Sequence, residues 1–147
     1  MIKQVLTTSF ISLGVGFVAE LLNGWLQATF LHVFFESNLV TILVALLAVN
    51  AATMGIVLTK MRDLIDKNGN GDAFNKTKKN MLLSIKEQIG LIILATIILS
   101  IKSSPAIQSV QNMPLLFNSI ITGIFVYALL VLYDTAKGVL IVVDFDG

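Results

Sequence analysis

Long apolar segments without charge constrain this 147-residue sequence more than any other feature. The clearest covers residues 39–59 and reads LVTILVALLAVNAATMGIVLT, with no charged side chain. A helix needs about 20 mostly apolar residues to cross the hydrocarbon core of a bilayer. We expect such helices at about residues 8–35, 39–60, 81–102 and 115–137, with Lys86 and Glu87 marking the start of the third apolar run. The sequence therefore predicts an all-α, polytopic membrane protein whose residues 1–147 form one four-helix transmembrane domain.

The composition excludes most soluble and catalytic classes. Hydrophobic residues make up 56% of the chain and charged residues 13%, whereas soluble domains average about 45–50% and about 25%. The chain has no cysteine and one histidine, His32, which excludes disulfide frameworks, thiol chemistry and histidine-rich metal centres. Because no catalytic triad or cofactor motif is present either, we expect neither enzymatic activity nor a cofactor.

The distribution of basic residues predicts the orientation in the membrane. Six of the ten basic residues lie in the connection at 61–80 and at its edge, whereas Glu36–Asn38 and residues 103–114 carry none. Since cytoplasmic loops are enriched in Lys and Arg, we expect this loop and both termini in the cytoplasm of a bacterial cell, with the protein in the inner membrane. Lys102, at the outer end of the third helix, is an exception. Residues 138–147 either extend the fourth helix or lie along the membrane surface.

The basic loop is also a candidate binding surface. It attracts the head groups of anionic lipids, or alternatively an anionic cytoplasmic regulator such as a nucleotide or oligonucleotide, bound through its phosphates. We expect no readout of duplex nucleic acid. The candidate residues are Lys60, Arg62, Lys67, Lys76, Lys78 and Lys79.

Polar residues form a stripe along the first helix. At 100° per residue the stripe covers an arc of roughly 80°, and its members are Ser9, Ser12, Gly16, Glu20, Asn23 and Gln27. Polar and ionisable groups facing lipid are costly, so the stripe faces protein or water. In one interpretation it packs against the other helices, with Ser12 and Gly16 as a small-residue contact.

In the other interpretation the stripe lines a pore between identical subunits. Glu20 would then form a ring of carboxylates that favours cations. Phe30 and Phe34 continue the same face toward the outer end and are candidates for a hydrophobic gate. Because four helices cannot enclose a wide aqueous path, a pore implies a homo-oligomer.

Residues 66–77 resemble the calcium loop of EF-hands. Such loops carry oxygen ligands at positions 1, 3 and 5 and a glycine at position 6, and here Gly71 occupies the glycine position. Position 12, a bidentate Glu in EF-hands, is Thr77, which predicts weak binding at most. The alternative is an Asn/Gly-rich turn between helix ends. The candidate ligands are Asp66, Asn68, Asn70 and Asp72.

These features predict a homo-oligomeric membrane pore or ion channel that is controlled by a cytoplasmic signal. In size and layout the chain resembles the small multi-pass membrane effectors of bacterial anti-phage systems, which implies a toxic protein that depolarises or permeabilises the inner membrane. Two alternatives stay open. One is a docking or accessory subunit of a transport system, and the other is a holin-like lysis protein.

Overall fold

The computed structural model describes residues 2–68, 72–110 and 112–144, and the regular structure in these ranges is helical. The elements are α1 (Ile2–Leu26), α2 (Phe30–Asn68), α3 (Asp72–Lys102), the short α4 (Pro105–Gln108) and α5 (Met113–Asp144). Four of them, α1, α2, α3 and α5, are long and apolar enough to cross a membrane. This confirms the all-helical architecture with four candidate spans and indicates a multi-pass membrane protein.

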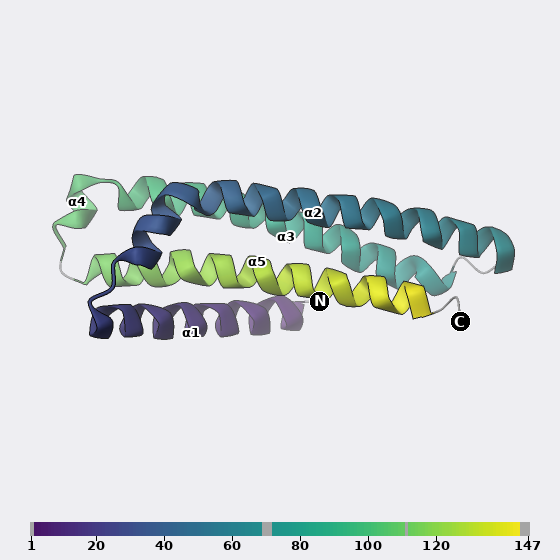
Figure 1. Ribbon diagram of the computed structural model, residues 1–147, viewed down its shortest axis with the longest axis horizontal. Coiled ribbons are helices and arrows are strands. Elements are labelled where there is room, and N and C mark those ends of the chain that lie inside the picture. The colour runs from purple at the N-terminus through teal and green to yellow at the C-terminus, as the bar shows by residue number, and fades with distance from the viewer. Residues whose placement is uncertain (1, 69–71, 111, 145–147) are drawn as a thin grey trace.

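The helix α5 lies at the centre of the bundle. It packs against α1, α2 and α3, whereas α1 packs against α5 and makes no comparable contact with α2 or α3. In Figure 1, α2 and α3 run side by side on one side of α5 and α1 lies on the other. The last turns of α5 lie toward the end of the bundle where α2 leads into α3, whereas α4 lies at the opposite end, where α1 turns into α2. This arrangement agrees with termini on one side of the membrane, and the assignment of that side to the cytoplasm stays a prediction.

The turn between the first two helices lies at residues 27–29, and not at Glu36–Asn38 as the sequence suggested. Gln27 adopts a left-handed conformation with φ 52°. The Gln27 amide donates to the Gly24 carbonyl (3.3 Å) and the Ala28 amide donates to the Asn23 carbonyl (2.9 Å). This pair of bonds is the Schellman motif, which ends α1 by satisfying its last carbonyls. The sequence suggested that the helix breaks at the polar residues 36–38, but these residues continue the helix α2.

A glycine at the left-handed position should stabilise this turn. Non-glycine residues in the left-handed region are strained by about 1 kcal/mol, so Gln27→Gly should raise the stability of the detergent-solubilised protein by up to that amount. Thermal unfolding checks the prediction. The variant Gln27→Ala keeps the strain and should show no gain, so equal gains from both substitutions would contradict this explanation.

The expected loop at 61–80 is helical in its described parts. The helix α2 continues to Asn68, α3 begins at Asp72, and residues 69–71 lie outside the described residues. At 1.5 Å per residue, the 39 residues of α2 and the 31 residues of α3 span about 58 and 46 Å, well beyond the roughly 30 Å of a bilayer core. The two helices therefore extend past the membrane as a hairpin, whose own buried cluster includes Met61, Leu64, Phe74 and Met81.

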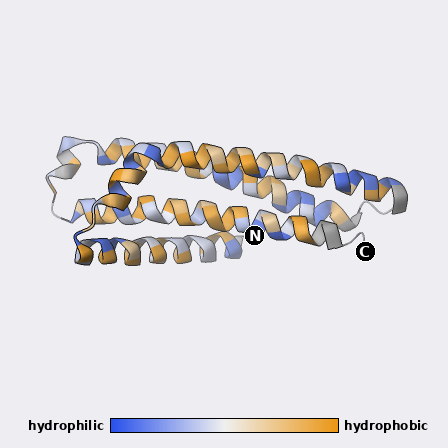
Figure 2. Cartoon of the chain, viewed as in Figure 1, coloured by the Kyte–Doolittle hydropathy of each residue, from blue (hydrophilic) through white to orange (hydrophobic). Residues whose placement is uncertain are grey.

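The main core joins α2, α3 and α5. Leu39, Leu43, Ala95, Ile121 and Ala128 are buried in it, and Figure 2 shows that apolar residues dominate the central parts of the long helices. A buried amide pair crosses this core, in which the Asn50 side chain donates to Gln88 Oε1 at 2.9 Å. The helix α5 continues to Asp144, so the segment after residue 137 extends the fourth helix, and residues 145–147 lie outside the described residues.

Candidate functional site

The polar stripe of α1 meets α5 of the same chain. Ser12 is 1% exposed and Asn23 is 9% exposed. A Cβ atom added to Gly16 would lie 2.3 Å from the Ser119 carbonyl oxygen and 2.7 Å from the Gly123 amide nitrogen. Small residues allow this close approach of two membrane helices. For these members of the stripe the structure favours the packing interpretation, and lining of a pore stays a prediction.

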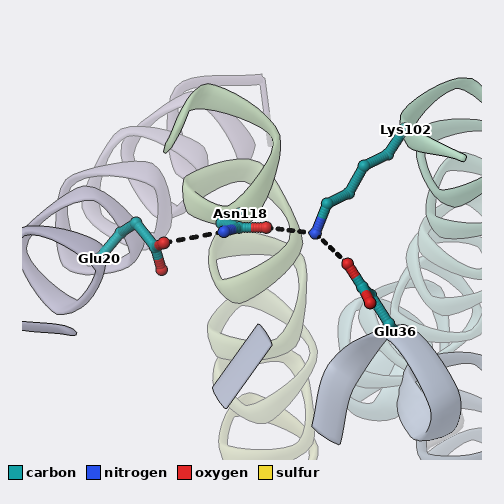
Figure 3. A network of polar contacts seen from close by, with 4 residues as sticks. All are labelled: Glu20, Glu36, Lys102 and Asn118. Carbon is teal, nitrogen blue, oxygen red and sulfur yellow. Dashed lines mark hydrogen bonds and ion pairs between the residues drawn. The ribbon is translucent and has the colours of Figure 1, made fainter. Parts of the chain in front are cut away.

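The stripe residue Glu20 belongs to a polar network near one end of the bundle (Figure 3). The Asn118 amide on α5 donates to Glu20 Oε1 at 2.8 Å, and the Lys102 ammonium on α3 donates to Asn118 Oδ1. Lys102 also forms an ion pair with Glu36 on α2. On α1 itself, Asn23 donates to Glu20 Oε2 at 3.5 Å. This outer network (Glu20, Asn118, Lys102 and Glu36) therefore joins α1, α5, α3 and α2 at one level.

The outer network explains three residues that sequence reasoning placed elsewhere or passed over. Glu36 was expected in a loop, Lys102 was an exception to the charge rule, and Asn118 was not singled out. The ion pair could have been predicted from the charge pattern, because Glu36 and Lys102 carry opposite charges at the same predicted end of neighbouring helices. Glu20 lies six residues before the end of α1, about 9 Å from it.

The proposed gate residues do not continue the stripe. Phe30 and Phe34 belong to α2, beyond the turn that ends α1. Their rings stack with centroids 5.6 Å apart, and both side chains are exposed in the single chain. Gln27 lies in the turn itself and is exposed. The expectation that these residues extend the face of the first helix is wrong, because the helix ends at Leu26.

A second polar region lies toward the opposite end, between α1, α3 and α5. Two neighbouring cavities share Glu87 of α3 and Tyr127 of α5, and together we call them the inner fissure. Its polar cavity is lined by residues that include Gln4, Thr8, Glu87, Tyr127, Asp134 and Lys137. Its apolar cavity is lined by residues that include Ser9, Gly90, Leu91, Leu94 and Ile124. The fissure exists because α1 packs on α5 without covering α3.

Polar contacts between helices organise the inner fissure. The Gln4 side chain donates to Asp134 Oδ2 at 3.0 Å, which joins α1 to α5. The Tyr127 side chain interacts with both Glu87 and Ser9, so it links α5 to α3 and to α1. Glu87 is half-buried, although its position in the sequence suggested a residue at the helix boundary. Ser9 and Ser12 are the members of the α1 stripe that line this fissure.

The basic candidates lie on the α2–α3 hairpin. Arg62, Lys76, Lys78 and Lys79 are exposed and Lys60 is half-buried, whereas the side chain of Lys67 lies outside the described residues. Arg62 and Lys78 line a cavity between α2 and α3 whose other walls are mainly apolar. A binding role for these residues stays a prediction.

The calcium candidates are only partly described. Asp66 lies in α2 and pairs with Arg62 at 4.0 Å. The side chains of Asn68 and Asp72, and all of Asn70, lie outside the described residues. Within the described part of the chain, no three His, Cys, Asp or Glu residues cluster in a way that could hold a metal ion.

Comparisons with protein-family models, curated proteins and solved structures return no match.

Proposed function

We propose that this chain is the subunit of a homo-oligomeric membrane pore that conducts small cations, with the inner fissure facing the axis of the assembly. The observation that carries the proposal is the position of Glu87. Glu87 lines both cavities of the fissure and belongs to a candidate membrane span, and ionisable residues inside membranes mark ion and proton pathways by default.

The shape of the fissure supports an oligomer. Polar side chains of the fissure would be costly against lipid, yet α1 leaves the α3 side of the fissure uncovered within one chain. Neighbouring subunits arranged around an axis would separate this face from the surrounding bilayer. Carboxylates repeated around the axis then favour cations over anions.

The carboxylates of Glu20 and Glu87 differ in their partners. The Glu20 carboxylate accepts hydrogen bonds from Asn118 and Asn23 and belongs to a network that contains the Lys102 ammonium. Glu87 instead lines two cavities. We therefore assign the cation site to Glu87, with Asp134 at the entrance, and a structural role to Glu20.

Cation flux into liposomes tests this assignment. The purified protein should carry K⁺ or Na⁺ across the membrane, and Glu87→Gln should lower the flux at least about tenfold because it removes the charge that attracts the ion. The matched control Asp63→Asn removes one exposed carboxylate on the hairpin and should leave the flux unchanged. Normal flux in Glu87→Gln, a larger loss in Glu20→Gln, or a monomer by native mass spectrometry would each overturn the proposal.

The fissure also favours a second candidate, the docking subunit. An uncovered side of α3 beside α1 offers space for a transmembrane helix of a partner protein, and polar residues stabilise such contacts. A docking subunit would be silent when reconstituted alone, whereas a pore would conduct. Membrane-potential dyes in bacterial cells that express the protein test its role in the cell. A defence effector or a lysis protein should depolarise the cells.

A further inference from the structure

The two cavities of the inner fissure differ in chemistry along the helix axes. The residues that line the polar cavity include Glu87, Asp134 and Lys137. The apolar cavity continues from Glu87 and is lined mainly by aliphatic side chains such as Leu91 and Leu94. A ligand that fills both must have a polar head and a long apolar tail.

The order of the two cavities along α3, polar and then apolar, matches the order of head group and acyl chains in the inner leaflet of the predicted bilayer. Lys102 ends α3 at the predicted outer surface, and Glu87 precedes it by 15 residues, about 22 Å at 1.5 Å per residue. Leu94 precedes Lys102 by eight residues, about 12 Å. In a hydrocarbon core of about 30 Å, Glu87 then lies about 8 Å inside the inner boundary and Leu94 lies near the centre. The rest of the polar cavity on α3, from Thr77 to Ser84, extends from Glu87 toward that boundary. A phospholipid of the inner leaflet has this orientation.

The charges select the head group. Two carboxylates disfavour an anionic lipid, and they favour a head group whose ammonium donates hydrogen bonds. Lys137, whose ammonium lies 4.4 Å from the centre of the Tyr133 ring, offers a positive charge for the phosphate. Phosphatidylethanolamine carries both an ammonium with N–H donors and a phosphate, whereas the choline head group has no N–H donor.

We propose that the inner fissure binds one molecule of phosphatidylethanolamine. Its ammonium contacts Glu87 and Asp134, its phosphate contacts Lys137, and one acyl chain lies against Leu91 and Leu94. The lipid covers Glu87 and thereby closes the fissure to cations. This closing role rests on the proposed function, whereas the binding itself does not.

Native mass spectrometry of the detergent-purified protein measures the binding directly. The protein is incubated with phosphatidylethanolamine, phosphatidylcholine or phosphatidylglycerol. The wild type should retain phosphatidylethanolamine about tenfold better than either of the other two lipids. The variant Glu87→Gln should lose this preference, and the control Asp63→Asn should keep it. Equal retention of the three lipids by the wild type would overturn the proposed site.

A substitution that fills the apolar cavity provides an independent test. Gly90 lines that cavity, and a Cβ atom added there meets no other atom within 4 Å. Gly90→Leu should therefore fold normally and lower retention about tenfold by occupying the space of the acyl chain. A Cβ atom on Gly55 of α2 is equally unobstructed, so Gly55→Leu is the control. Equal retention by Gly90→Leu and Gly55→Leu would contradict binding in this cavity.

Flux and binding then separate the two proposals. Cation flux should rise when phosphatidylethanolamine is omitted from the liposomes. Flux that is independent of this lipid, with binding intact, would overturn the closing role alone. Selective binding without flux in any liposome would overturn the pore and leave the lipid site standing.

Discussion

The substitution Gly16→Val should detach α1 from the bundle. The new side chain would meet the backbone of α5, at Ser119 and Gly123, and backbone atoms cannot move aside as a flexible side chain can. Overpacking costs about 1–3 kcal/mol and occasionally more, and a clash with backbone atoms belongs at the upper end of that range. Because α1 packs chiefly against α5, no other contact of similar extent would retain it.

Two measurements follow this loss. The apparent melting temperature in detergent should fall. Protease should cleave within or beside α1, while the other helices stay folded and resist cleavage. Gly14→Val is the matched control, because a Cβ atom on Gly14 of the same helix meets nothing within 4 Å and the change in helix propensity is the same. If both variants lost stability equally, the close contact between α1 and α5 would be refuted.

The second large effect is expected from Asn118→Leu. Asn118 is buried and connects Glu20 on one side with Lys102 on the other. Hydrogen bonds to charged groups contribute about 1.5–3 kcal/mol each, so removal of both should lower the free energy of unfolding by about 3 kcal/mol. The leucine has a similar size, and the loss therefore reports on polar contacts more than on packing.

Chemical denaturation in detergent micelles measures the difference. The control Asn38→Leu replaces an exposed asparagine whose side chain donates only to the Phe34 carbonyl of its own helix, at 2.9 Å. It should change stability by less than about 0.5 kcal/mol, as surface substitutions usually do. Similar losses at the two positions would show that the outer network does not join the helices in solution.

Some of the fold followed from local sequence. The number of spans could be predicted because each span needs a long apolar run, and such runs are visible without any contact information. The ends of the helices were harder to predict from the sequence. The turn at 27–29 depends on one left-handed residue, Gln27, which glycine would have signalled better. Glu36–Asn38 looked like a turn because its residues are polar, but it lies inside α2, where Glu36 forms an ion pair with the distant Lys102.

The candidate site was harder to predict than the fold. The helical period alone places Ser12, Gly16 and Glu20 together, and the structure buries Ser12 and Gly16, with Gly16 against the α5 backbone. The surface that packs against the stripe could not be predicted from the sequence. It could be α5 of the same chain or a second subunit, and long-range packing decides between them. Glu87 looked like a boundary residue, and only the uncovered space between α1 and α3 assigns it to a cavity.

The sequence by itself determined that this chain is helical, that it is apolar enough to cross a membrane four times, and that its polar residues are confined to a few faces. These properties depend on composition and on the helical period, which act locally. The tertiary structure decided which faces meet. It placed Gly16 against the α5 backbone, linked Glu20 to Lys102 through Asn118, and left the inner fissure open, because helix contacts depend on shape and pairing across the whole chain.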